Sequence, residues 1–117
     1  MTAADLVIVG AGALALALAL ALLEQGKREA EGLVVVDPSG AWLTAWRDRF
    51  GRHRIDRLRS AAVHHPHPDP HRLRLHARSR DRLDELHHPY DLPSTALFED
   101  FCASQAHGAG LERAVRP

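Results

Sequence analysis

The residues best suited to bind a ligand are three small residues near the N-terminus, Gly10, Gly12 and Ala15, and one acid, Asp37. Gly10 permits a sharp turn out of a preceding strand, and Gly12 lets the backbone approach a phosphate where a Cβ would collide. Ala15 takes the third place of a G-x-G-x-x-G pattern, where a small residue lets a helix pack closely on the strand. This spacing predicts a cradle for a pyrophosphate.

We expect the residues that bind the pyrophosphate to form one uninterrupted stretch of the chain. A helix that opens in this stretch directs its unsatisfied N–H groups and the positive end of its dipole at the ligand, and both favour an anion. The predicted phosphate-binding residues are Gly10, Ala11, Gly12, Ala13, Leu14 and Ala15.

An acid follows at the spacing of a ribose contact, because Asp37 lies 22 residues beyond Ala15 and ends a second apolar run. A carboxylate there accepts hydrogen bonds from the adenosine ribose and repels a 2′-phosphate, which predicts FAD or NAD rather than NADP as the first dinucleotide. Pro38 and Ser39 in the following turn are predicted to lie against the same ligand.

Two apolar runs and the segment between them must position these residues. Residues 6–9 and 33–36 are typical of strands, and their uniformly apolar sequence predicts burial on both faces of a parallel sheet. The Leu/Ala segment between them is predicted to be a helix ending at Gly26, since both residues are strong helix formers. The order predicts an α/β fold with a Rossmann-like βαβ dinucleotide-binding unit over residues 1–40.

The same stretch has two other interpretations. Leu6 to Leu23 carries no charge, a length at the lower limit for a membrane span. A secretory signal would need a positively charged start, yet no Lys or Arg precedes Lys27. Neither alternative explains why glycines, a second strand and an acid follow in order, so we expect no membrane association.

The chain of 117 residues is one domain by length, but short for a dinucleotide-binding enzyme. Because no comparable β-branched run follows Val36, residues 41–117 are expected to form a helix- and loop-rich extension. We expect the domain of 1–117 to be truncated, with a missing C-terminal domain or partner chain, and residues 111–117 to approach another strand.

Formal net charge is zero, which gives no reason to expect nucleic acid as a partner. Residues 41–82 nevertheless hold eleven arginines and four acids, and we interpret this basic third as a solvated or phosphate-facing surface. Cys102 is the only cysteine, so no internal disulfide forms. A reducing, cytoplasmic setting and a place for Cys102 in the core are expected.

Three aromatic residues, Trp42, Trp46 and Phe50, recur at four-residue spacing and would share one face of a short helix. They are either a core-facing stripe or a wall against the flavin or adenine ring, and the spacing leaves both open.

The segment from His64 to His71 has many potential metal ligands, but its three prolines hold the backbone extended, so we expect a surface loop and no metal site. Two helices are predicted after it. One begins at Pro70 with Asp69 as its N-cap, and the other is capped by Ser94 or Thr95.

Further residues carry a family resemblance. They are Val9–Gly12, Val34–Pro38, Trp42, Trp46, Leu58–Ser60, His64–Pro66, Pro68–Pro70, Tyr90–Ser94, Leu97, Phe98, Phe101 and Cys102. With them the chain resembles the start of FAD-dependent oxidoreductases of the flavin-containing and N-hydroxylating monooxygenase group. The resemblance implies that the βαβ unit holds the ADP part of FAD, through Gly10, Gly12 and Asp37. It also implies that NADPH binds a second domain, absent here, and that oxygen is passed to a nucleophilic nitrogen, sulfur or carbon.

The leading hypothesis is therefore an FAD-binding N-terminal portion of a flavoprotein oxidoreductase, with an NAD(P)H-dependent monooxygenase as the parent enzyme. No catalytic residue can be named, and no turnover is expected from the chain alone. The alternatives are an NAD-dependent dehydrogenase-type nucleotide-binding fragment and an inactive truncated remnant.

Overall fold

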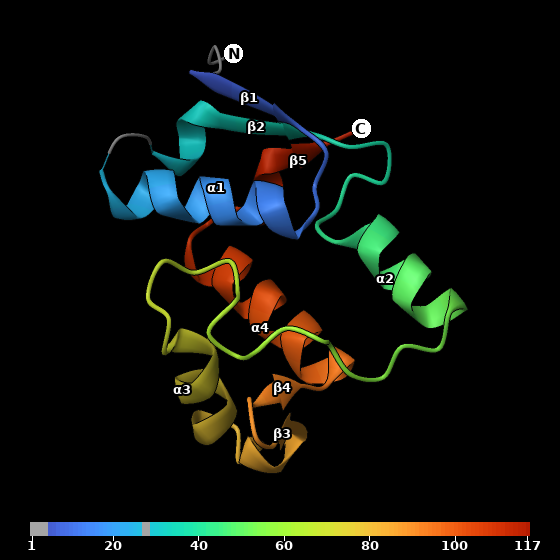
Figure 1. Ribbon diagram of the computed structural model, residues 1–117. Coiled ribbons are helices and arrows are strands. Elements are labelled where there is room, and N and C mark those ends of the chain that lie inside the picture. Colours follow the sequence, from blue (N-terminus) through green and yellow to red (C-terminus); the bar gives the residue numbers. More distant parts are fainter. Residues whose placement is uncertain (1–4, 27–28) are drawn as a thin grey trace.

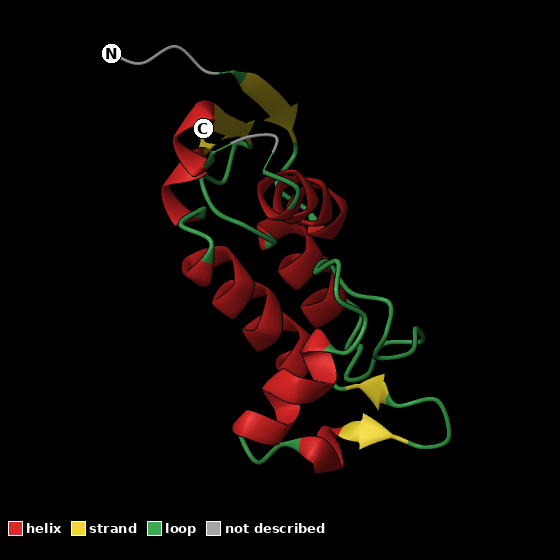
Figure 2. Cartoon of the chain, turned by 90° about the vertical axis from the view of Figure 1, so that its left-hand side faces the viewer, coloured by secondary structure: helices red, strands yellow, loops and turns green. Residues whose placement is uncertain are grey.

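The computed structural model describes residues 5–26 and 29–117. A parallel sheet lies at one end of the molecule and the helices extend away from one of its faces, as Figures 1 and 2 show. The helices are α1 (Ala13–Glu24), α2 (Thr44–Arg52), α3 (Arg72–Ser79) and α4 (Thr95–Gly108). The strands are β1 (Leu6–Val9), β2 (Leu33–Val36), β3 (Leu86–His87), β4 (Leu92–Pro93) and β5 (Val115–Arg116).

The parallel sheet has the order β1-β2-β5. Val9 pairs with Val36, and Val36 pairs in turn with Arg116, so the carboxyl ends of the three strands meet at one edge. This arrangement confirms the predicted α/β fold with a Rossmann-like unit, and both long strands have the predicted bounds. The third strand, at residues 115–116, comes from the predicted extension, where the sequence indicated another strand.

The prediction that both faces of β1 and β2 are buried is wrong. Ile8 and Val35 are buried, but Val7 is 54% exposed and Val9 84% exposed. In the described part of the chain the helices lie on one side of the sheet only, below it in Figure 1. An apolar sequence is compatible with burial on both faces, but whether each face is covered depends on where the helices pack.

The Leu/Ala segment forms α1, as predicted, despite its strand-like alternation. Its buried side is formed by Leu16, Ala19 and Leu20, while Leu14 on the other side is 87% exposed. Gly26 follows the helix with a φ of +68°, a left-handed conformation that glycine adopts without strain. The prediction that the helix ends at this glycine is confirmed.

Helix α4 runs through the part of the molecule below the sheet in Figure 1, and it packs against both α1 and α3. The Ser94 hydroxyl accepts a hydrogen bond from the Leu97 N–H at 3.0 Å, which confirms Ser94 as the N-cap. Phe101 and Cys102 are buried on this helix, and burial raises the pKa of the Cys102 thiol to about 12. Cys102 is therefore a core residue, as predicted.

Two predicted helix starts are displaced. Helix α2 begins at Thr44, so Trp42 precedes it and does not share a helical face with Trp46. The reason is Leu43, whose φ of +61° is left-handed and breaks the helical path. Helix α3 begins at Arg72 with His71 as its N-cap, so the predictions of a start at Pro70 and of Asp69 as the N-cap are wrong. The Asp69 carboxylate instead accepts the His71 N–H at 2.9 Å, in the turn that precedes the helix.

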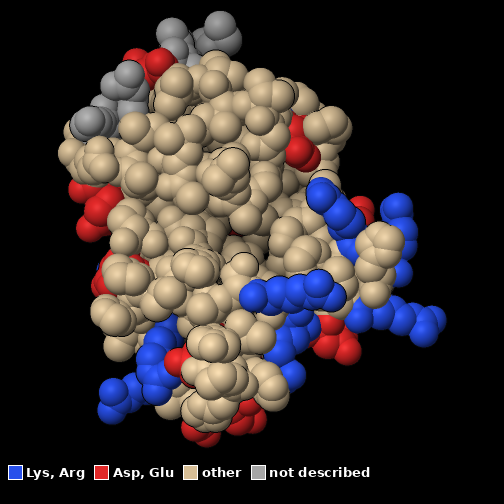
Figure 3. Space-filling view, in the orientation of Figure 1, with Lys and Arg blue, Asp and Glu red and all other residues tan. Residues whose placement is uncertain are grey.

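Basic side chains gather below the sheet. In Figure 3, the Lys and Arg side chains extend from the lower half of the molecule, whereas the surface above them is mostly uncharged. This distribution matches the basic middle third of the sequence, which forms α2, α3 and the segment between them.

Candidate functional site

The predicted glycine loop lies directly after β1, at the carboxyl edge of the sheet. Gly10 has a φ of +94°, which a residue with a side chain rarely adopts, and its N–H donates to the Val36 carbonyl at 2.8 Å. The loop therefore leaves β1 through a turn that requires glycine and stays bonded to β2.

Gly12 forms the N-cap of α1, and no side chain caps the helix in the described residues. A Cβ built on Gly12 meets no described heavy atom within 4 Å, so the space beside the loop is open to a ligand. The described first turn of α1 carries no acidic residue. Its free N–H groups and positive dipole end favour a phosphate, and the glycine keeps that approach clear.

Asp37 lies beside this loop, one residue beyond β2. The Ala11 N–H donates to its Oδ1 at 3.2 Å, while the N–H and the hydroxyl of Ser39 donate to Oδ2, the N–H at 3.1 Å. The Ser39 hydroxyl, followed by the N–H groups of Ser39 and Ala11, lowers the pKa of Asp37 from its ordinary value. The acid is thus held ionised next to the glycine loop.

Two further contacts, which the sequence did not reveal, hold the loop and the acid in place. The Leu43 N–H donates to the Ala11 carbonyl at 2.7 Å, and the Asp37 N–H donates to the Arg116 carbonyl at 2.8 Å. Leu43 is buried in a left-handed conformation, and no sequence signal marks a leucine for that role. The loop is therefore anchored by β2 and by Leu43 at the start of α2, and Asp37 is anchored by β5.

The structure brings most of the predicted residues together. Gly10, Ala11 and Gly12 form the loop, Ala13 to Ala15 form the first turn of α1, and Asp37 to Ser39 form the turn after β2.

The two tryptophans contact the core. Trp42 donates from its Nε1 to the Leu111 carbonyl at 2.9 Å, while Trp46 stacks on Phe50 with ring centroids 4.1 Å apart and also contacts Phe98. These contacts favour the core-facing alternative. A wall against a bound ring remains a prediction for both.

A groove continues from the glycine loop along the exposed sides of β1 and α1. It has a volume of about 700 Å³ and is lined by Gly10, Gly12 and apolar side chains that include Val9 and Leu14. The loop thus opens onto an apolar surface.

The His/Pro segment lies away from the loop. His65 packs edge-on against Phe101, and burial lowers the pKa of His65, so this segment is not wholly the surface loop that was predicted. In residues 5–26 and 29–117, no cluster of three or more His, Cys, Asp or Glu side chains is placed to hold a metal ion.

Comparison with known proteins gives one match. A family model described as FAD-NAD(P)-binding matches residues 7–115, which include the loop and the acid. No curated protein and no solved structure matches the chain. None of the described helices combines the length and the apolar character needed to cross a membrane.

Proposed function

This chain belongs to the FAD-NAD(P)-binding family, and we propose that it binds the ADP part of FAD as part of an NAD(P)H-dependent flavoprotein monooxygenase. The observation that carries the proposal is the open, uncapped N-terminus of α1 at Gly12 beside the ionised Asp37. An anion-binding site and a hydroxyl acceptor lie next to each other, as the pyrophosphate and ribose of a dinucleotide require.

The glycine loop and the turn after β2 bind different parts of the nucleotide in this proposal. The N–H groups of residues 12–15 bind the pyrophosphate, and Asp37 accepts from the ribose, with Pro38 and Ser39 beside it. The flavin supplies the redox chemistry when it is bound, and this chain binds and orients its nucleotide end. The residues that contact NADPH and substrate belong to other parts of the parent enzyme.

The choice of FAD and of a monooxygenase rests on the sequence resemblance. Family membership is compatible with FAD and with NAD(P), and a dehydrogenase-type fragment that binds NAD would use the same loop. Titration of FAD and of NAD into the cofactor-free protein, followed by its visible absorption spectrum, separates the two. Tighter binding of FAD supports the flavoprotein, and tighter binding of NAD supports the dehydrogenase-type fragment. A cytoplasmic location is part of the same proposal.

Substitution of Gly12 tests the site. Gly12→Val should abolish nucleotide binding, because the new side chain occupies the space where the phosphate approaches. Folding should be preserved, since a Cβ at this position meets no described atom within 4 Å. The measurement is FAD affinity by fluorescence quenching, with circular dichroism as the check on folding.

Gly51→Val is the matched control, because Gly51 lies in α2, away from the loop, and a Cβ there also meets no described atom within 4 Å. This variant should bind FAD as the unchanged protein does. An unaltered affinity in Gly12→Val would overturn the assignment of the cradle.

A further inference from the structure

The carboxylate of Asp37 has little acceptor capacity left for a ribose. A carboxylate offers about four lone-pair positions. Three donors already use them, namely the N–H groups of Ala11 and Ser39 and the hydroxyl of Ser39. One position remains, on Oδ1, whereas a ribose with both hydroxyls free offers two donors.

The second acceptor is available on Ser39. A serine hydroxyl has one proton and two lone pairs. The hydroxyl donates to Asp37 Oδ2, its nearest acceptor, and the Ala41 carbonyl oxygen lies 3.1 Å away as a second acceptor for the same proton. One lone pair accepts the Ala41 N–H at 3.2 Å. Among the described contacts the other lone pair of Ser39 Oγ has no donor, and the side chain is exposed.

Backbone hydrogen bonds close the turn that carries Ser39 and hold it against the sheet. The Gly40 N–H donates to the Asp37 carbonyl at 2.9 Å, and Gly40 has a φ of +70°. The Asp37 N–H is bonded in turn to β5 through the Arg116 carbonyl. Ser39 Oγ is therefore fixed relative to the carboxylate by its own hydrogen bonds and by the backbone of the turn.

We propose that Ser39 is the second ribose-binding residue of this site, and that Ser39 and Asp37 together select nucleotides whose ribose has both the 2′ and the 3′ hydroxyl free. The inference rests on the proposed nucleotide function and adds a specificity determinant to it. One ribose hydroxyl donates to Asp37 Oδ1 and the other donates to Ser39 Oγ. Pre-positioned acceptors of this kind reject analogues that lack a donor, because a polar atom of the site is then left without a partner.

The experiment compares ADP, 2′-deoxy-ADP and 3′-deoxy-ADP by isothermal titration calorimetry. The unchanged protein should bind ADP more tightly than either deoxy analogue. Ser39→Ala should bind ADP about threefold to tenfold more weakly, the loss of one hydrogen bond. It should also lose the preference over one deoxy analogue and keep the preference over the other.

Two further variants separate binding from folding. Ser39→Thr keeps the hydroxyl and should restore the lost preference. Ser79→Ala removes a hydroxyl that donates to the His76 carbonyl on α3, so it should leave all three affinities unchanged.

The outcomes distinguish this inference from the proposed function. If the unchanged protein binds ADP and Ser39→Ala keeps both preferences, or weakens all three ligands equally, the role of Ser39 is overturned and the cradle stands. If the unchanged protein binds none of the three nucleotides, both are overturned.

Discussion

At the scale of single residues, Asp37, which we propose as the ribose acceptor, is charged in advance of binding. The side chain of Ser39 and two backbone N–H groups stabilise the carboxylate of Asp37 and lower its pKa. Because the pKa is lowered, Asp37 stays ionised at pH values at which an ordinary aspartate takes up a proton. The acceptor therefore keeps its charge in mildly acidic solution.

This charge predicts how binding depends on pH. The ratio of FAD affinities between the unchanged protein and Asp37→Asn should stay constant from about pH 7 to about pH 4. The lowered pKa keeps Asp37 ionised over this range, whereas an ordinary aspartate begins to take up a proton as the pH approaches about 3.9. Taking the ratio cancels titration of the adenine, which both proteins experience. Equilibrium dialysis at several pH values measures it, with circular dichroism confirming that both proteins stay folded. A ratio that falls steadily from about pH 5 downward would contradict the lowered pKa.

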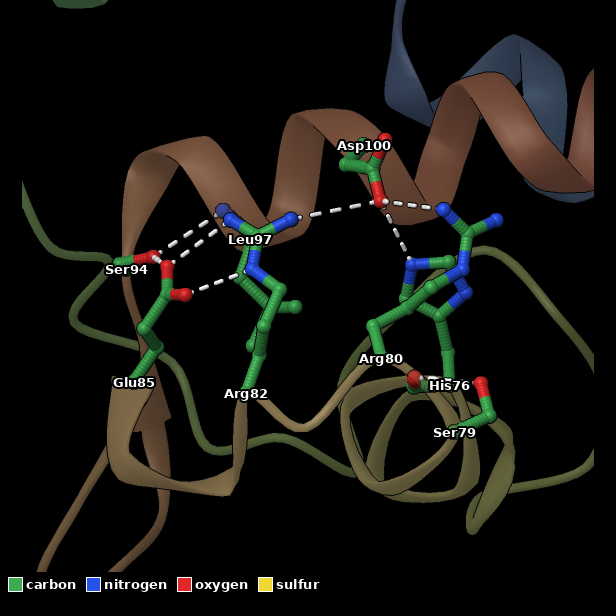
Figure 4. Close-up of polar contacts among 8 residues, drawn as sticks. All are labelled: His76, Ser79, Arg80, Arg82, Glu85, Ser94, Leu97 and Asp100. Atoms are coloured by element: carbon green, nitrogen blue, oxygen red, sulfur yellow. Dashed lines mark hydrogen bonds and ion pairs between the residues drawn. The ribbon is translucent and has the colours of Figure 1, made fainter.

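At the scale of elements, a charged network joins α3 to α4 (Figure 4). His76 and Arg82 both reach Asp100 Oδ2, the first at 2.9 Å and the second at 3.4 Å. Arg82 also forms a two-pronged ion pair with Glu85, at 2.6 and 2.9 Å. Glu85 accepts the hydroxyl of Ser94 at 2.6 Å, so the network reaches the N-cap of α4. The network fixes the hairpin of β3 and β4 against α4, whose buried side chains form part of the core.

The network makes the free energy of unfolding depend on pH. Hydrogen bonds from Arg82, and then from Ser94, lower the pKa of Glu85 to about 2 from an ordinary value of 4.5. Because the folded pKa is the lower one, the contribution of Glu85 is complete above the unfolded value and is lost as the pH falls toward 2. Glu85→Gln should destabilise the protein by about 1 to 2 kcal/mol at neutral pH, and the difference should vanish near the folded pKa.

Urea unfolding at a series of pH values tests this dependence. Glu24→Gln, at the exposed end of α1, is the control, and it should cost less stability at neutral pH. A difference between the unchanged protein and Glu85→Gln that does not shrink as the pH falls would show that the carboxylate contributes no ionic stabilisation.

At the scale of the whole molecule, segments far apart in the chain share one core. Strand β5 pairs with β2, Trp42 is bonded to Leu111, and α4 packs against α1. The buried residues form one cluster that includes Val35 from the sheet and Phe101 from α4. The sheet and the helices below it therefore depend on each other for burial.

A shared core predicts a single cooperative transition. Unfolding followed by tryptophan fluorescence and by far-ultraviolet circular dichroism should give coincident curves, because loss of either half exposes the common cluster. Hydrogen exchange should show protection in α4 as well as in β1 and β2. Protection confined to residues 5–37 would contradict this and would favour the inactive remnant instead.

Features that depend only on neighbouring residues could be predicted from the sequence. The turn at Gly10, the helix after Gly12, the end of that helix at Gly26 and the cap at Ser94 all follow from local backbone preferences or from bonds across a few residues. The position of Asp37 follows from strand and helix lengths. These features include the central residues of the candidate site.

The contacts between elements that are distant in the chain could not be predicted in this way, because the three-dimensional fold sets them. It exposed Val9, bonded Trp42 to Leu111, placed β5 beside β2 and forced Leu43 into a left-handed conformation against the glycine loop. It also placed the Ser39 hydroxyl within hydrogen-bonding distance of the Asp37 carboxylate. The physical reason is that burial and long-range hydrogen bonds depend on which surfaces meet in space, and a short stretch of sequence carries no information about its distant neighbours.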